Sequence, residues 1–188
     1  MTPPTPDGDE VPAVPRRPAE APTDNPPMAA QLITERLTLR PFAVSDIDVY
    51  RALVAERGHG LPTAEDVHGR IAEQLAEAAR SGIRLYALRR RAEGDVVGYC
   101  GLIVGRATRA EPEIGYELFR HAQGRGEAAE AARAVLAAAV TTGRRRLWAT
   151  VRTGNTASLR VLDKLGFERD HTSTDRKGEL IWLTRGLR

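Results

Sequence analysis

Hydrophobic and polar positions follow two different periods along this chain, and together they predict an alternating series of strands and helices. Alternation over residues 36–40 and short apolar runs predict six strands, at residues 36–40, 84–89, 96–104, 114–119, 147–151 and 179–184. Apolar residues three to four positions apart predict four helices, at residues 45–57, 63–81, 127–140 and 156–165. The order is strand, two helices, three strands, helix, strand, helix, strand. This order predicts the α/β (mixed α+β) class, with one domain built on one central sheet.

Capping residues and glycines mark the expected ends of these helices. Ser45 and Thr63 are the expected N-caps of the first two helices, because a hydroxyl oxygen can accept a hydrogen bond from a first-turn amide. Glycine follows each helix, where it can adopt the left-handed conformation that ends helices; these glycines are Gly58, Gly82, Gly143 and Gly166.

The first 30 residues differ in composition from the rest of the chain. They hold nine of the twelve prolines and few large apolar side chains, so we expect a disordered tail at 1–30 and one domain at 31–188. A proline-rich partner motif is the alternative, but the prolines show no clean repeat. The tail has a net charge of −3, which leaves the domain at +6. A mildly basic domain suits an anionic ligand without requiring nucleic acid.

Several classes of protein are excluded by what the sequence lacks. No apolar run approaches the ~20 residues of a membrane-spanning helix, so no membrane partner is expected. The N-terminus has no apolar segment typical of a signal peptide, and cytoplasmic localisation is expected. The single cysteine, Cys100, cannot form an internal disulfide. No metal is expected, because no metal-ligand spacing is found among the histidines, His59, His68, His121 and His171.

The segment after the fourth strand has the pattern of an anion site. Residues 118–128 pass from a strand through a glycine-containing loop into a helix. Helix N-termini carry unpaired N–H groups and partial positive charge, and Gly124 and Gly126 remove the Cβ atoms that would keep a phosphate away. Arg125 adds charge, and Ala128 keeps the next position small. We therefore expect a cradle for a phosphate, built mainly from backbone.

Two motifs are compatible with such a cradle. Residues 124–129 fit the dinucleotide pattern G-x-G-x-x-G/A, but the strand at 147–151 ends without the acidic residue that this motif requires. Residues 123–128 (Gln-Gly-Arg-Gly-Glu-Ala) also satisfy Q/R-x-x-G-x-G/A. Downstream, residues 155–167 read N-x-x-S-x-x-x-x-x-K-L-G-F.

With these motifs the chain resembles the GNAT superfamily of acyl-CoA-dependent N-acetyltransferases. The segments Glu-Ile-Gly-Tyr-Glu-Leu at 113–118 and Thr-Glu-Arg-Leu-Thr-Leu-Arg-Pro at 34–41 resemble its branch of ribosomal-protein N-terminal (Rim-type) acetyltransferases. The resemblance spans about residues 32–185. It implies one GNAT-like domain with a mixed, mostly antiparallel sheet that splays at the coenzyme site and carries helices on both faces.

The resemblance also implies a coenzyme site for acetyl-CoA as co-substrate. The backbones of Leu118 and Phe119 would pair with the pantetheine arm, and an N–H near Leu118 would polarise the thioester carbonyl. Asn155 would orient the coenzyme or the carbonyl. The pyrophosphate would be held by backbone amides of one segment, namely those of Gln123, Gly124, Arg125, Gly126, Glu127 and Ala128.

An amine attacks a thioester only when it is neutral, so a base has to remove its proton. Glu113 is the preferred base by resemblance, and Glu111 and Glu117 are competitors that strand alternation places on the same side. Many relatives offer a tyrosine as proton donor to the thiolate, but Leu162 stands at that position here. Ser158 is the candidate acid, unless the thiolate leaves without one.

The resulting hypothesis is an N-acetyltransferase that moves an acetyl group from acetyl-CoA to a primary amine, either a protein N-terminus or a small molecule. One alternative is a non-catalytic acyl-CoA-binding regulatory module, and another is a basic ribosome- or RNA-associated binding protein. Nucleic acid is not expected, because the arginine runs at 89–91 and 144–146 have no aromatic stacking platform beside them. The chain is expected to be a monomer or a homodimer.

Overall fold

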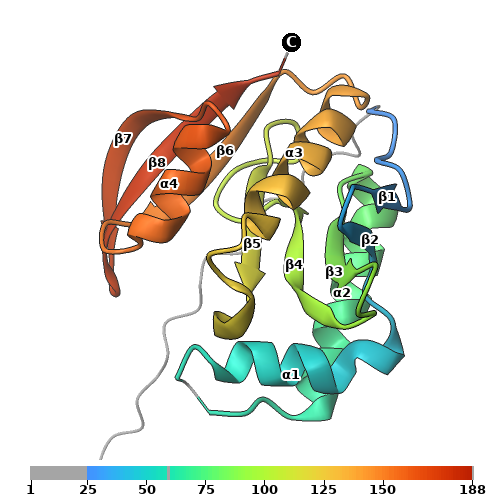
Figure 1. The fold of residues 1–188 in the computed structure, drawn as a ribbon. Helices are drawn as coiled ribbons and strands as arrows, with labels where there is room; N and C mark the ends of the chain where they lie inside the picture. The colour runs from blue at the N-terminus through green and yellow to red at the C-terminus, as the bar shows by residue number, and fades with distance from the viewer. Residues whose placement is uncertain (1–24, 59, 188) are drawn as a thin grey trace, which may run out of the picture.

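The computed structural model describes residues 25–58 and 60–187. In this part of the chain eight strands form a single sheet in the order β1-β2-β3-β4-β5-β6-β8-β7, with four α-helices around it (Figure 1). All neighbouring strands are antiparallel except β5 and β6, which are parallel. The prediction of one α/β domain with a mixed, mostly antiparallel sheet is confirmed.

The strands vary from two to nine residues in length. They are β1 (Leu32–Ile33), β2 (Leu37–Pro41), β3 (Leu85–Arg90), β4 (Val96–Ile103), β5 (Glu113–Leu118), β6 (Arg146–Arg152), β7 (Glu168–Asp175) and β8 (Gly178–Gly186). The helices are α1 (Ile47–Ala55), α2 (Ala64–Ser81), α3 (Glu127–Val140) and α4 (Thr156–Lys164), and 3₁₀ turns η1 (Val44–Asp46) and η2 (Arg120–Ala122) precede α1 and α3. Helix α3 has the predicted bounds, because its alanine-rich sequence and flanking glycines are local signals.

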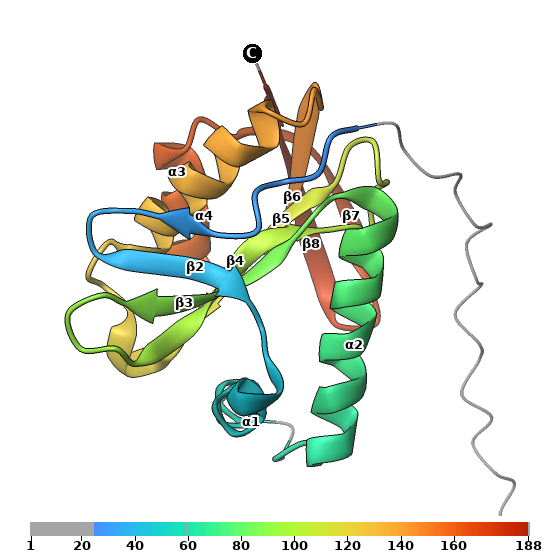
Figure 2. The ribbon, with the colours of Figure 1, turned by 90° about the vertical axis from the view of Figure 1, so that its right-hand side faces the viewer.

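Helices cover both faces of the sheet (Figure 2). Helices α3 and α4 lie on one face, where the larger core contains Leu88 and Val135. Helices α1 and α2 lie on the other face over a smaller core that contains Phe42, Val67 and Ile71. Each face of the sheet is therefore covered by its own pair of helices. A gap between strands would connect the two faces.

The two predicted N-caps have different outcomes. Thr63 caps α2 as predicted: its Oγ1 accepts from the Asp66 N–H at 3.1 Å, and the Asp66 carboxylate accepts from the Thr63 N–H at 3.1 Å. The prediction for Ser45 is wrong, because Ser45 lies inside η1 and α1 begins two residues later. There the Asp46 carboxylate accepts from the Ala43 N–H at 2.8 Å, so an acidic side chain, and not the Ser45 hydroxyl, accepts from the backbone at this turn.

The alternation of the sequence predicts six strands, and the structure adds two edge strands, β1 and β7. Strand β7 consists of polar residues only, six of its eight residues are exposed, and none is fully buried. It is held by backbone pairing to β8, from Glu168 opposite Thr184 to Asp175 opposite Gly178. An edge strand of this kind carries no hydrophobic period, so a pattern of burial cannot predict it.

The structure describes residues 25–30 of the expected tail, and two of them contact the domain. Met28 is 1% exposed and belongs to the main core, and its N–H donates to the Gly82 carbonyl at 2.8 Å. The Asn25 side chain donates to the Thr142 carbonyl at 2.8 Å. The rest of the expected tail, residues 1–24, lies outside the described residues. Within the described ranges no helix combines the length and hydropathy needed to cross a membrane.

Strands β5 and β6 pair only at their beginning. Glu113 lies opposite Trp148, and the Trp148 N–H donates to the Pro112 carbonyl at 2.9 Å, but no further pair joins the two strands. Beyond this point the strands diverge, as Figure 1 shows between the β5 and β6 labels. The divergence leaves the second half of β5 without a neighbour on one side, between α3 and α4.

Candidate active site

A groove of about 440 Å³ lies at this divergence, between α3, α4 and the end of β5. Its volume falls within the ~300–1,000 Å³ of small-molecule sites. Its lining contains eight of the residues predicted for the site, namely Leu118, Gln123, Gly124, Gly126, Glu127, Ala128, Asn155 and Ser158. Three other predicted residues, Glu113, Phe119 and Arg125, are not among its lining residues. The loop, the strand end and the second motif, which are separate in sequence, therefore form one surface.

The N-terminus of α3 opens into this groove without a side-chain cap. Gly126 is the N-cap residue, and no side chain accepts from the first turn of α3. By contrast, Thr63 caps α2 and Asn155 caps α4. Gly124 and Gly126 both have φ of +79°, a conformation that other residues adopt only with strain. Within the described residues, the first amides of α3 are thus left for an anion, which the helix dipole favours.

The end of β5 presents one of its two predicted backbone groups to the groove. The Phe119 N–H donates to the Val97 carbonyl on β4 at 3.0 Å, and its carbonyl accepts from Ala122 at 2.9 Å. Because N–H directions alternate along a strand, the Leu118 N–H points the other way, into the gap between β5 and β6. Both backbone groups of Phe119 thus have partners within the fold, and its pairing with the pantetheine arm stays a prediction. The Gln123 side chain donates to the Leu118 carbonyl at 3.0 Å and fixes the loop to the strand.

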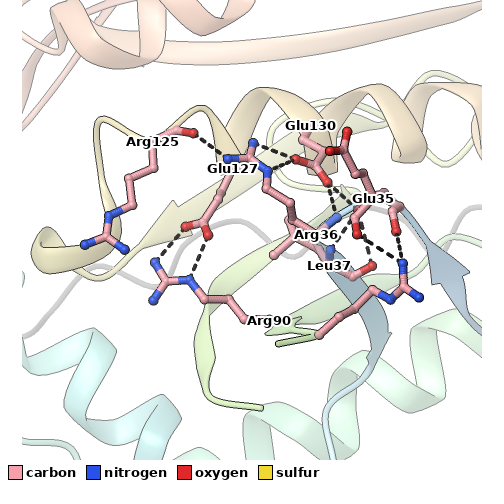
Figure 3. Close-up of polar contacts among 9 residues, drawn as sticks. Glu35, Arg36, Leu37, Arg90, Arg125, Glu127 and Glu130 are labelled. Atoms are coloured by element: carbon pink, nitrogen blue, oxygen red, sulfur yellow. Dashed lines mark hydrogen bonds and ion pairs between the residues drawn. The ribbon is translucent and has the colours of Figure 1, made fainter. Parts of the chain in front are cut away.

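A cluster from the start of the chain holds the first turn of α3 in place (Figure 3). The Glu130 carboxylate accepts from the Thr34 hydroxyl at 2.6 Å, from the Arg36 N–H at 2.9 Å and from Arg36 Nε at 2.6 Å. Arg36 Nη1 also donates to the carbonyl of Arg125 at 2.9 Å. The Thr-Glu-Arg segment at 34–36 therefore ties the loop before α3 to the edge of the sheet.

A buried ion pair supports the same turn from the side of the sheet (Figure 3). Arg90 Nε and Nη2 donate to the two carboxylate oxygens of Glu127 at 2.7 and 2.9 Å, and both residues are less than 9% exposed. The pair draws the Glu127 carboxylate toward β3, so its negative charge faces Arg90 while its backbone stays at the groove. Removal of one partner would leave a buried charge without a counterion, which is strongly destabilising.

We predict that Glu130→Gln weakens coenzyme binding through the loop rather than by direct contact. Burial raises the pKa of Glu130, but hydrogen bonds from Thr34 and Arg36 outweigh it and lower the pKa overall. The ionised carboxylate should therefore stabilise the fold by about 1–2 kcal/mol at pH 7. This contribution is lost as the pH falls below the unfolded pKa of ~4.3 and through the lower folded pKa.

The measurements are urea unfolding at pH 7 and pH 3 and titration calorimetry with coenzyme A. A three- to tenfold weaker affinity is expected, because ordering the loop on binding should then cost about 1 kcal/mol of binding free energy. Glu168→Gln, at an exposed position of β7, is the control. An unchanged affinity with lowered stability would show that the cluster serves the fold alone.

Helix α4 brings its two predicted residues to the inner end of the groove. The Asn155 Oδ1 accepts from the Ser158 N–H at 3.1 Å and so caps the helix. Tyr116, which sequence reasoning missed, reaches from β5 to donate its hydroxyl to the Ser158 carbonyl at 3.1 Å. Burial raises the pKa of Tyr116, so its phenol stays protonated. Leu162 is 1% exposed, so the position of the tyrosine in many relatives is filled by a buried aliphatic side chain.

The three candidate bases lie on the face of the sheet opposite α3 and α4, and their surroundings differ. Glu113 is 4% exposed; its carboxylate accepts from the Arg106 N–H and from the Thr150 hydroxyl, the latter at 2.8 Å. Glu117 is paired with Arg57 of the α1–α2 connection, whose Nε lies 3.0 Å from Oε1. Glu111 accepts from the Trp148 indole N–H at 3.1 Å.

A second cavity, of about 310 Å³, adjoins the groove. It is lined by the diverging parts of β5 and β6, by α4 and by Arg106 from the β4–β5 loop. Tyr116, Asn155 and Ser158 line both cavities, so the two spaces meet at these residues. The gap in the sheet therefore joins a groove on the α3/α4 side to a second cavity beside Thr150, the hydrogen-bond partner of Glu113.

The single cysteine belongs to the core. Cys100 is fully buried in β4, and burial raises the pKa of its thiol, so a nucleophilic thiolate is disfavoured there. Within the residues that the structure describes, no group of three histidine, cysteine or acidic side chains could hold a metal ion.

Comparison with known proteins identifies the family. A family model described as "Acetyltransferase (GNAT) domain" matches residues 36–168, which is more than half of the chain. The chain belongs to the GNAT acetyltransferase family. It is 28% identical over 161 residues to the uncharacterized N-acetyltransferase p20 of Bacillus licheniformis, covering 80% of this chain and 90% of that protein. The protein is thus an N-acetyltransferase that uses acetyl-CoA.

Solved GNAT structures agree with this assignment. A GnaT-family acetyltransferase from Bordetella pertussis superposes with a TM-score of 0.76 at 27% identity, over 84% of this chain and 99% of that chain. RimL, a ribosomal L7/L12 alpha-N-protein acetyltransferase solved with coenzyme A, gives a TM-score of 0.72 at 16% identity, over 83% and 97%. The likeness to RimL shows a shared fold only. The family match over residues 36–168 confirms the predicted superfamily.

Proposed function

We propose that this GNAT enzyme transfers the acetyl group directly to a primary amine that enters from the side of the second cavity. The observation that carries the proposal is that the two cavities meet at Tyr116, Asn155 and Ser158. One cavity ends at the uncapped N-terminus of α3, which suits a pyrophosphate. The other leads to the opposite side of the sheet, so acetyl-CoA and the amine can approach one another through the gap.

The catalytic roles follow from what lies near the meeting point. The amine nitrogen forms a bond to the thioester carbon, the C–S bond breaks, and the proton of the amine passes to Glu113, directly or through water. The Leu118 N–H stabilises the negative charge that develops on the carbonyl oxygen. Ser158 supplies a proton to the departing sulfur, or the thiolate leaves unprotonated. Glu113 itself lines neither cavity, and its assignment rests on its contact with the hydroxyl of Thr150, which lines the second cavity.

The acceptor is a protein N-terminus or a small-molecule amine. A Rim-type acceptor is supported by the segments at 34–41 and 113–118 and by the shared fold with RimL, whose own acceptor is the N-terminus of a ribosomal protein. The small-molecule alternative is supported by the modest volume of the second cavity, about 310 Å³. Direct assay separates the two.

The decisive experiment measures thiol release from acetyl-CoA in the presence of a panel of amines, N-terminal peptides and ribosomal proteins. Thiol release that depends on an acceptor, together with mass spectrometry of an N-acetylated product, supports the proposal. Tight binding of acetyl-CoA without release on any acceptor would favour the regulatory module, for which the loss of the tyrosine at Leu162 is the support.

The RNA-binding alternative has less support from the structure. The arginine runs considered as nucleic-acid patches are partly internal: Arg90 and Arg144 are 8% and 4% exposed. Arg90 is paired with Glu127, and Arg144 donates to the Arg109 carbonyl at 3.0 Å. Because both side chains are buried, their guanidinium groups cannot reach phosphates at the surface.

A further inference from the structure

The lining of the second cavity is positively charged. Arg106 and Arg152 line it together with hydroxyl, amide and apolar groups. Among the described residues that line it there is no aspartate or glutamate. A cavity that meets the coenzyme groove at Asn155 and Ser158 thus receives the acceptor into an environment with two guanidinium groups. This charge distribution restricts which amines can bind.

The two guanidinium groups are held in place by one carboxylate behind them. Arg152 Nη2 donates to the two oxygens of Asp175 at 2.6 and 2.7 Å, and its Nη1 donates to the Gly178 carbonyl at 2.7 Å. Arg106 Nη2 donates to Asp175 Oδ2 at 3.0 Å. Neither Asp175 nor Glu113, whose carboxylate accepts from the Thr150 hydroxyl, is among the lining residues, so the charged groups that line the cavity itself are both cationic.

The bridge joins three segments that surround the cavity. Arg106 belongs to the β4–β5 loop, Arg152 ends β6, and Asp175 ends β7. The hydrogen bond from Arg152 lowers the pKa of Asp175, and a further bond comes from the Lys177 N–H at 2.8 Å. Asp175 therefore stays ionised near neutral pH, and the guanidinium groups need little further ordering when a ligand binds.

The positive lining has two effects on an amine. It disfavours the ammonium form and so favours the neutral nucleophile that the reaction requires. It also repels acceptors that carry only positive charge and attracts those with an anionic group. If the proposed acetyl transfer holds, both effects favour an acceptor that combines an amine with an anion.

We infer that the acceptor is an amine that carries a carboxylate or phosphate a few bonds away, and that Arg152, with Arg106, binds this anion. A guanidinium group donates charge-assisted hydrogen bonds to either anion. The cavity volume of about 310 Å³ suits a group of amino-acid size. Arg152 is thus assigned to acceptor specificity.

The test compares acceptors that differ only in the anion. The pairs are L-phenylalanine with 2-phenylethylamine, O-phosphoethanolamine with ethanolamine, and the amidated dipeptide Ala-Asp with Ala-Asn. They separate an α-carboxylate, a phosphate and an acidic peptide side chain as sources of the charge. For each pair kcat/KM is measured with the wild type, Arg152→Gln, Arg152→Lys and Arg176→Gln.

Arg176→Gln is the matched control. It removes one positive charge from the same β7–β8 turn, but Arg176 is exposed and does not line the cavity. The unfolding temperature of each variant, and its affinity for coenzyme A, report separately on the fold and on the coenzyme groove. These two readouts should be alike in all four proteins.

We expect the anionic member of at least one pair to be the better substrate of the wild type. Arg152→Gln should lower its kcat/KM by about 10- to 100-fold and that of its neutral partner by less than about threefold. Arg152→Lys should retain part of the preference, and Arg176→Gln all of it. Equal use of both members, or an equal loss for both in Arg152→Gln, overturns the inference.

Absence of turnover with every anionic acceptor also overturns the inference. If amines without an anion are acetylated in that case, the proposed acetyl transfer stands and only the acceptor class is wrong. If no amine of any kind is acetylated, the proposed transfer fails as well. The two failures are therefore distinguishable by the same panel.

Discussion

Gly126→Trp should abolish coenzyme binding while leaving the fold largely intact. Gly126 is the N-cap of α3, its φ is +79°, and it lines the groove next to amides that no side chain of the described chain caps. An indole at this position occupies the space of the pyrophosphate, and a residue with Cβ adds backbone strain. The affinity for coenzyme A should fall by more than about 100-fold, or ~2.7 kcal/mol.

The control is Gly94→Trp, which introduces the same kind of backbone strain at a site away from the groove. Gly94, in the turn between β3 and β4, has φ of +77°, and a Cβ there would meet only the end of the flexible Arg89 side chain, at 3.4 Å. Titration calorimetry and thermal unfolding are measured for both variants. Similar unfolding temperatures with a selective loss of binding in Gly126→Trp support the cradle. An unchanged affinity in Gly126→Trp would show that the coenzyme does not use the N-terminus of α3.

The second large effect is expected for Glu113→Gln, which should lower the rate of acetyl transfer by about 100- to 10,000-fold near neutral pH. The substitution suits the site sterically. The amide oxygen can still accept from the Arg106 N–H, and the Thr150 hydroxyl, which donates to Glu113 now, can turn to accept from the amide nitrogen. The principal loss is then the ability to take a proton.

The pH dependence separates a base from a positioning group. A peptide α-amine has a pKa of ~7.7–8.0 and a lysine-like amine ~10.4. As the pH rises toward the pKa of the acceptor amine, a larger fraction of the amine is already neutral, and the defect of Glu113→Gln should shrink. A loss of equal size at every pH would instead assign Glu113 to positioning. Glu117→Gln is the comparison, because Glu117 faces the same side of the sheet but is paired with Arg57.

Local signals explain the part of the site that was predicted. The glycines at 124 and 126 and the start of α3 at Glu127 depend on neighbouring residues, so the uncapped helix N-terminus is visible in the sequence. The same holds for Asn155, whose capping bond reaches only three residues along the chain. The motifs therefore indicated where the groove lies, because α3 and α4, which form its two walls, begin directly after Gly126 and Asn155.

Contacts between distant residues explain what was not predicted. Glu130 lies 94 residues from Arg36, and Glu127 lies 37 residues from Arg90, so no window of sequence contains either pair. Strand β7 carries no hydrophobic period, and its place at the edge depends on pairing with β8. The use of the Phe119 backbone by β4 likewise depends on strand register, which is a property of the sheet.

The sequence by itself determined the family, the order of most elements and the turn that suits a phosphate, because hydrophobic period, glycine conformation and helix capping act over a few residues. The tertiary structure alone decided that β5 and β6 part after one pair, that two cavities meet at Tyr116, and that Arg106 and Arg152 converge on Asp175. These features arise where segments far apart in the chain pack together. Their geometry follows from the sheet as a whole.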